Sequence, residues 1–160
     1  DPKILQWRFV VDCPDARNIV LCENLNFLKT PRIARDNHIE LWYVGGNNIS
    51  NIDYIPDHKL TLPLYYSCDW DYDGLKIYER LQDRFARKSK SITLLYPSPI
   101  LRKSVDSPEH NSRWKHDQPF SGLIRSAYSQ EAISLIQDLI AQDEWVEEET
   151  CELIEMVKLT

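Results

Sequence analysis

The chain has 160 residues, of which 42% are hydrophobic, and its formal net charge is −6 at pH 7. This size suits one domain with one buried core, and no apolar stretch approaches the roughly 20 residues that span a bilayer. We therefore expect a single cytoplasmic domain over residues 1–160 without membrane contact. Because the chain begins at Asp1 rather than methionine, we expect it to be the C-terminal part of a longer protein.

The first half of the chain alternates between strand-like and helical segments. Short apolar, β-rich runs predict strands over residues 4–11, 19–24, 39–46 and 62–69. Residues 24–35 predict one or two short helical turns interrupted by Pro31, and residues 47–62 form a polar connection.

The second half contains the longer helical patterns. Residues 73–88 and 128–142 carry apolar side chains at helical spacing and predict two amphipathic helices. Residues 91–99 predict a further strand that is stopped by prolines, residues 100–118 are polar and irregular, and residues 145–157 predict a last helix.

This alternation of apolar strands and helices predicts an α/β fold of the Rossmann-like kind. We expect a central, mostly parallel sheet that is covered by helices on both faces. In such sheets ligands collect at the carboxyl ends of the strands. Glu23, the glycine pair Gly45–Gly46 and the stretch from Asp69 to Asp71 each lie at the end of a predicted strand, so we expect them to meet at one edge of the sheet.

Residues 69–74, with the sequence DWDYDG, place three carboxylates at every second position. Repulsion between such groups is tolerable only if solvent or a cation relieves it. A plain turn in which Asp73 caps the following helix is one interpretation, but it leaves the other strand ends without an explanation. An EF-hand calcium loop begins with this spelling, but its twelfth position requires Glu and holds Arg80 here, and a helix should precede it.

The remaining interpretation is a magnesium site for phosphoryl transfer. Asp69 and Asp71 project to the same side if the strand continues through them. Two such carboxylates can hold a divalent ion that keeps part of its water shell and binds a substrate phosphate. Glu23, at a neighbouring strand end, could complete the shell of the ion or act as a general acid or base.

The order of these motifs resembles the TOPRIM fold of topoisomerases, DnaG-type primases and several nucleases. The elements that carry the resemblance are Glu23–Asn24, the glycine pair and the DWDYDG stretch, within roughly residues 15–100. The finer resemblance is to the C-terminal domain of the JetD-like nuclease subunits of Wadjet anti-plasmid systems, which are similar to the topoisomerase VI A subunit. JetD-like proteins also carry an E-Q-E segment preceded by Arg near the C-terminus, where this chain has residues 147–149, EEE, without that Gln or Arg.

The resemblance implies metal-dependent cleavage of double-stranded DNA, by a homodimer that a condensin-like SMC complex recruits. The implied catalytic residues are Glu23, Asp69 and Asp71, with Glu23 as general acid or base. The implied ligands of Mg²⁺, or of Mn²⁺ in its place, are Glu23, Asp69, Asp71 and Asp73. The tyrosine with which the related topoisomerases break DNA belongs to a separate upstream domain, so the resemblance implies no covalent cleavage by this chain.

Basic residues provide candidate contacts to the DNA backbone. The acidity of the chain is concentrated in residues 138–160, whereas residues 76–90 carry six basic and two acidic residues. Lysines and arginines contact phosphates without reading sequence, and the candidates are Lys76, Arg80, Arg84, Arg113 and Lys115. The last two belong to a basic loop with His110 and His116, whose spacing suits neither a helix face nor a zinc motif.

Two other functions remain open on the sequence. A catalytically degenerate TOPRIM domain could serve as a docking or dimerisation module, with the acidic C-terminal segment as its surface. Another Mg²⁺-dependent phosphotransfer domain, such as a phosphatase or a receiver, would use the same acids, although a receiver requires an acidic pair where Glu23 stands alone. Titration with a divalent metal distinguishes a working site from a docking module.

Overall fold

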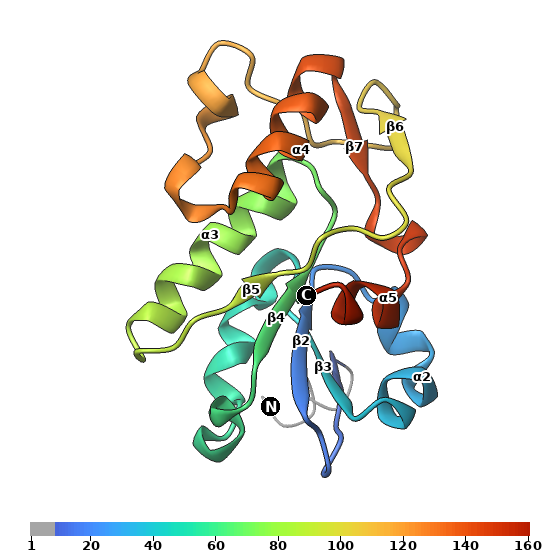
Figure 1. Ribbon diagram of the computed structural model, residues 1–160, viewed down its shortest axis with the longest axis vertical. Coiled ribbons are helices and arrows are strands. Elements are labelled where there is room, and N and C mark those ends of the chain that lie inside the picture. The colour runs from blue at the N-terminus through green and yellow to red at the C-terminus, as the bar shows by residue number, and fades with distance from the viewer. Residues whose placement is uncertain (1–8) are drawn as a thin grey trace.

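A computed structural model of the protein describes residues 9–160, and its centre is a five-stranded sheet (Figure 1). The strand order is β1-β3-β2-β4-β5, with β1 at Val10–Val11, β2 at Asn18–Cys22, β3 at Ile39–Tyr43, β4 at Leu64–Ser67 and β5 at Thr93–Leu94. Strands β2 to β5 pair in parallel, and β1 pairs antiparallel with β3. The predicted α/β class with a mostly parallel central sheet is confirmed.

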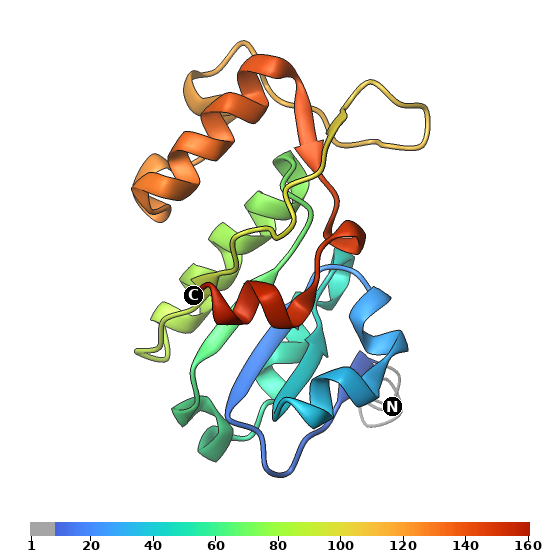
Figure 2. The same cartoon turned by 45° about the vertical axis from the view of Figure 1, so that its right-hand side comes forward.

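The middle strands are buried on both faces. In β2 the side chains of Ile19 to Cys22 are all fully buried, and because successive side chains alternate between the faces, both faces are covered. The α-helices are α2 (Pro31–Asp36), α3 (Tyr72–Ala86), α4 (Gln130–Gln142) and α5 (Leu153–Lys158). Tyr66 of β4 donates a hydrogen bond to the carbonyl of Gly74 in α3, and Figures 1 and 2 both draw α5 across β2.

A second, two-stranded sheet lies beyond the carboxyl edge of the first. Strand β6 (Arg102–Ser104) pairs antiparallel with β7 (Glu144–Val146). Figure 1 shows this pair and α4 above the ends of β2 and β4. The C-terminal part of the chain therefore covers the edge at which the sequence places the acidic residues.

The single helix predicted over residues 145–157 is wrong. This segment contains part of β7, a 3₁₀ turn at Glu148–Thr150 and then α5. The reason is a tertiary contact, because the backbone N–H of Trp70 donates to the carbonyl of Val146 at 2.8 Å. Pairing with β6 along residues 144–146, together with the bridge from Val146 to Trp70, thus holds this segment extended and overrides its local helical pattern.

Several predicted boundaries also change. Of the strand predicted over residues 4–11, residues 4–8 lie outside the described residues and Val10–Val11 form β1. The strand predicted over residues 91–99 is limited to β5. Residues 24–35 form the predicted short turns, but Pro31 begins α2 rather than interrupting a helix. The polar connection contains 3₁₀ turns at Gly46–Tyr54 and Asp57–Thr61. Within residues 9–160, no helix has both the length and the apolar character needed to cross a membrane.

Candidate active site

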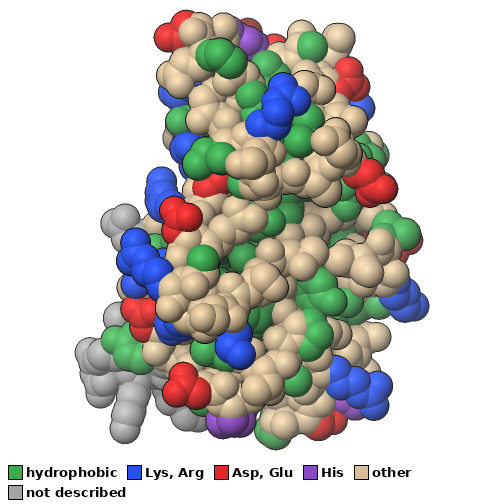
Figure 3. All heavy atoms as spheres, turned by 60° about the vertical axis from the view of Figure 1, so that its left-hand side comes forward, with side chains coloured by type: hydrophobic (Ala, Val, Ile, Leu, Met, Phe, Trp, Pro, Cys, Tyr) green, Lys and Arg blue, Asp and Glu red, His purple; other side chains and the backbone are tan. Residues whose placement is uncertain are grey.

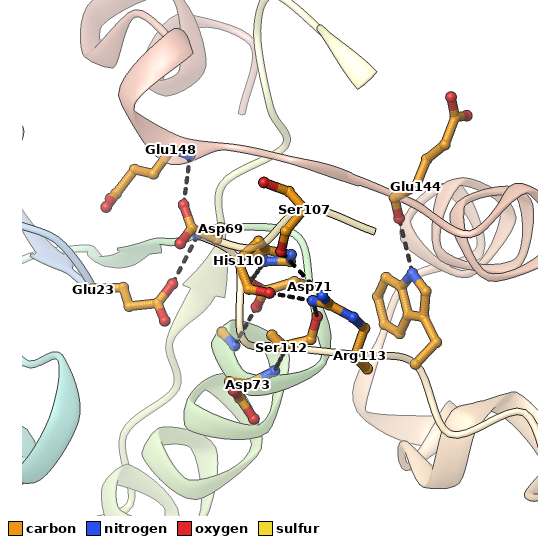
Figure 4. A network of polar contacts seen from close by, with 12 residues as sticks. Glu23, Asp69, Asp71, Asp73, Ser107, His110, Ser112, Arg113, Glu144 and Glu148 are labelled. Carbon is orange, nitrogen blue, oxygen red and sulfur yellow. Dashed lines mark hydrogen bonds and ion pairs between the residues drawn. The ribbon is translucent and has the colours of Figure 1, made fainter. Parts of the chain in front are cut away.

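The parallel pairing of β2 with β4 brings Glu23 next to the aspartate stretch. Cys22 is in register with Ser67, and the N–H of Glu23 donates to the carbonyl of Ser67 at 2.9 Å. Beyond this pair, the backbone N–H of Asp69 donates to Oε1 of Glu23 at 2.8 Å. The two strand ends therefore place the carboxyl groups of Glu23 and Asp69 together, as Figure 4 shows.

A fourth acidic residue, Glu148, joins this group from the C-terminal segment. Its backbone N–H donates to Oδ1 of Asp69 at 2.7 Å, and its Oε1 accepts from the N–H of Asn24 at 2.9 Å. The residue is only 1% exposed, and among residues 9–160 its buried Oε2 has no hydrogen-bond partner. Glu148 was not among the predicted site residues, although the acidic segment 147–149 of the family resemblance was a signal for it.

Asp71 occupies the N-terminal end of α3. Its Oδ1 accepts from the N–H of Gly74 at 2.8 Å, so it is the N-cap residue of the helix. Its Oδ2 lies 2.9 Å from Nε2 of His110. The interpretation in which Asp73 caps the helix is therefore wrong, because Asp73 lies inside the first turn, where it is exposed and its carboxyl group points away from Asp69 (Figure 4).

Two glycines permit the close approach of these segments. A Cβ atom on Gly45 would lie 1.8 Å from the carbonyl oxygen of Glu23, and one on Gly74 would lie 2.2 Å from the carbonyl oxygen of Asp69. Both contacts are with backbone atoms, which cannot rotate aside as a side chain can. The predicted glycine at the end of β3 is thus part of the site because the neighbouring strand end passes directly over it.

Burial and mutual repulsion raise the pKa of every carboxyl group in this cluster. Burial, followed by the charges of Asp69 and Asp71, raises the pKa of Glu23, and burial with the charge of Asp71 raises that of Asp69 to about 6. Burial raises the pKa of Glu148 to about 8. For Asp71, burial outweighs the opposing effect of its hydrogen bonds to Gly74 and His110 and raises the pKa. At neutral pH the cluster therefore either retains protons or needs a nearby cation.

The donor chemistry of the cluster suits a hard divalent cation. Carboxylate oxygens are the ligands that Mg²⁺ prefers, and the partnerless Oε2 of Glu148 is a buried acceptor that a cation would satisfy. In the part of the chain that the structure describes, however, no three His, Cys, Asp or Glu side chains are already arranged to hold one ion. The described side chains instead direct oxygens to backbone N–H groups, as in Glu23, Asp69 and Glu148.

Two of the predicted DNA-contacting residues form ion pairs with acidic side chains of the same chain. Lys76 pairs with Glu79 at 2.9 Å, and Arg84 pairs with Asp53 at 2.9 Å. Figure 3 shows the basic side chains on this side of the molecule spread among acidic and uncharged ones rather than gathered into one patch.

The other three candidates are exposed, and they differ in the contacts that their charged groups make. Arg113 donates to the carbonyl oxygens of Ser107, His110 and Ser112, and thereby folds its own loop. Lys115 is exposed, with its ammonium 5.0 Å from the ring centroid of Tyr72. Arg80 is exposed, and within residues 9–160 neither it nor Lys115 forms an ion pair with an acidic side chain, so these two charges are the freest of the five.

Comparison with known proteins gives no match: no protein-family model, no curated protein and no solved structure matches this chain. Function must therefore be inferred from the side chains and their arrangement. The structure brings together Glu23, Asp69 and Asp71 as predicted, adds Glu148 and His110, and leaves Asp73 at the solvent-exposed side of α3.

Proposed function

We propose that the chain is a metal-dependent DNA-cleaving domain of the TOPRIM type, resembling the C-terminal domain of JetD-like nuclease subunits. One observation carries the proposal, namely that Glu23, Asp69 and Asp71 converge from the ends of two adjacent parallel strands into one acidic cluster, in which Asp71 is buried and Glu23 and Asp69 are half-buried. Gathering several carboxylates away from water is costly even when they accept hydrogen bonds, so a cluster of this kind is retained for a purpose. A docking module would not need it.

Asp69, Asp71 and Glu148 are the residues that would hold Mg²⁺ or Mn²⁺, while Glu23 would stay free of the ion for proton transfer. When bound, such an ion neutralises charge on a phosphodiester and makes water a better nucleophile. Hydrolysis forms a bond from water oxygen to phosphorus and breaks a phosphorus–oxygen bond; the attacking water loses a proton to the solvent, and the leaving oxygen must receive one. Glu23, whose pKa is raised by burial and by its acidic neighbours, suits the role of the proton donor.

Double-stranded DNA is the substrate that we propose, with Arg80 and Lys115 as backbone contacts. Both side chains are exposed, and backbone contacts by basic side chains orient a duplex without reading its sequence. Assembly as a homodimer and recruitment by a condensin-like SMC complex follow from the family resemblance alone. The proposal of DNA cleavage does not depend on this assembly or on this recruitment.

The direct test incubates the full chain with supercoiled plasmid in Mg²⁺, in Mn²⁺ and in EDTA. We expect nicked and linear DNA with either metal and intact plasmid in EDTA. Hydrolysis of a phosphate monoester without cleavage of DNA would instead favour the phosphatase alternative. Intact plasmid under every condition, with no hydrolysis of the monoester, would contradict the proposal and favour the docking module.

A further inference from the structure

The loop between β6 and α4 is fastened to the start of α3 and to β7. Oγ of Ser112 accepts a hydrogen bond from the N–H of Asp73 at 3.0 Å, and the indole N–H of Trp114 donates to the carbonyl of Glu144 at 2.8 Å. Between these two contacts, the side chain of His110 forms a hydrogen bond with the carboxyl group of Asp71. A loop whose sequence is polar and irregular is thus held against the acidic cluster at three points.

The ring of His110 is fixed on several sides. It stacks on the indole of Trp145, with centroids 3.7 Å apart and planes 7° from parallel. The guanidinium of Arg113 donates to the carbonyl oxygens of His110 and Ser107, which fixes the backbone on which the ring is mounted. The side chain is only 10% exposed. These contacts restrain the position of the His110 ring more than is needed only to connect β6 with α4.

The orientation of the ring follows from its single polar contact. Within the described residues, Nδ1 of His110 is buried without a partner, and Nε2 lies 2.9 Å from Oδ2 of Asp71. The ionised carboxylate that would bind a cation only accepts hydrogen bonds, so in that form of Asp71 the imidazole is the donor through its Nε2–H. Oδ1 of the same carboxylate accepts from the N–H of Gly74. Both oxygens of Asp71 are therefore held from outside the acidic cluster, which fixes the rotation of its carboxyl group.

We propose that His110 is a positioning residue that holds the Asp71 carboxylate in the orientation required to bind a divalent ion. The inference rests on the proposed function, because it assigns His110 a task only if the cluster binds metal. Groups that hydrogen-bond to metal-binding side chains orient them, and their loss typically weakens metal affinity or activity by 10- to 100-fold. If His110 only packed the loop, its ring and not its N–H would matter.

Two substitutions in the full chain separate these roles. His110→Phe keeps an aromatic ring for stacking on Trp145 but removes the N–H donor. His110→Gln loses the aromatic stack, but its amide nitrogen can replace Nε2 as the donor to Asp71. The matched control is His116→Phe, because His116 forms an equally short pair with Asp143 at 2.8 Å, but both side chains are about half exposed.

The measurement is Mn²⁺ affinity by calorimetric titration, together with the melting temperature of each metal-free variant. We expect His110→Phe to weaken Mn²⁺ binding by about 10- to 100-fold, with His110→Gln and His116→Phe close to the wild type. Unchanged affinity in His110→Phe, or equal losses in the Phe and Gln variants, would overturn the inference while leaving the proposed function intact. No saturable binding by the wild type would overturn both.

Discussion

Asp69→Asn is expected to lower the rate of plasmid cleavage by at least about 10²- to 10³-fold, the range seen when one preorganised electrostatic group is removed from an active site. The substitution removes a negative charge from the centre of the cluster. It retains an oxygen that can accept the hydrogen bond from the N–H of Glu148, which lies 2.7 Å from Oδ1. The fold should therefore survive, and the measurement is the initial rate of loss of supercoiled plasmid in Mg²⁺.

The same substitution is expected to stabilise the metal-free protein above pH 6. Burial and Asp71 raise the pKa of Asp69 from 3.8 to about 6, so the folded state binds this proton more tightly than the unfolded state does. The stability of the wild type therefore falls as pH rises from about 4 through about 6, whereas the Asn variant has no such charge. Chemical denaturation in EDTA should show a gain of about 1–3 kcal/mol at pH 8 and little difference at pH 4.

The control for both effects is Asp57→Asn, which removes an exposed aspartate from the 3₁₀ turn before β4, whereas the cluster lies after the other end of that strand. It should leave the cleavage rate and the pH profile of stability unchanged. Wild-type cleavage by Asp69→Asn would show that the acidic cluster is not the cleavage site. A loss of metal-free stability at pH 8 would show that Asp69 is not repelled by its neighbours.

Gly45→Ala is expected to lower the free energy of unfolding by about 3 kcal/mol or more, at or beyond the upper end of the range for overpacked sites. The added Cβ would lie 1.8 Å from the carbonyl oxygen of Glu23. Relief requires β2 and β3 to separate at the end where their pairing is in register through Cys22 and Tyr43. For a domain of this size the melting temperature should fall by about 6–12 °C.

Gly46→Ala is the matched control, because it changes the neighbouring glycine in the same turn. Gly46 has a φ of +60°, and apart from its chain neighbours no atom of the described residues would lie within 4 Å of a Cβ there. Its cost is limited to placing an L-residue in the left-handed region, roughly 1–2 kcal/mol. Equal losses of stability in the two variants would contradict the close approach of Gly45 to Glu23, and would attribute both effects to the turn.

The strands and three of the site residues could be predicted because their signals are local. Buried parallel strands are continuous apolar runs, as in residues 19–22. Polar residues that directly follow such runs must emerge at the same edge of a parallel sheet. That rule alone places Glu23 and Asp69 together, and the spacing of the stretch adds Asp71.

The contributions of Glu148 and His110 could not be predicted, because they depend on distant contacts. Asn24 binds Glu148 across 124 positions of sequence, and His110 meets Asp71 across 39. The local pattern of residues 145–157 is helical, and the backbone pairing of β7 with β6 and of Val146 with Trp70 makes its start extended. Charge was also misleading, because Lys76 and Arg84 follow helical spacing but are engaged by Glu79 and Asp53.

Binding of a divalent ion by the acidic cluster is the central claim, and a Mn²⁺ titration followed by thermal unfolding tests it most directly. The proteins to compare are the wild type and the double variant Asp69→Ala/Asp71→Ala. At 100 times the dissociation constant, binding to the native state adds about 2.7 kcal/mol, roughly 5–11 °C for a domain of this size. We predict a saturable rise of this order in the wild type and none in the double variant. No rise in the wild type, or an equal rise in both proteins, would contradict the claim.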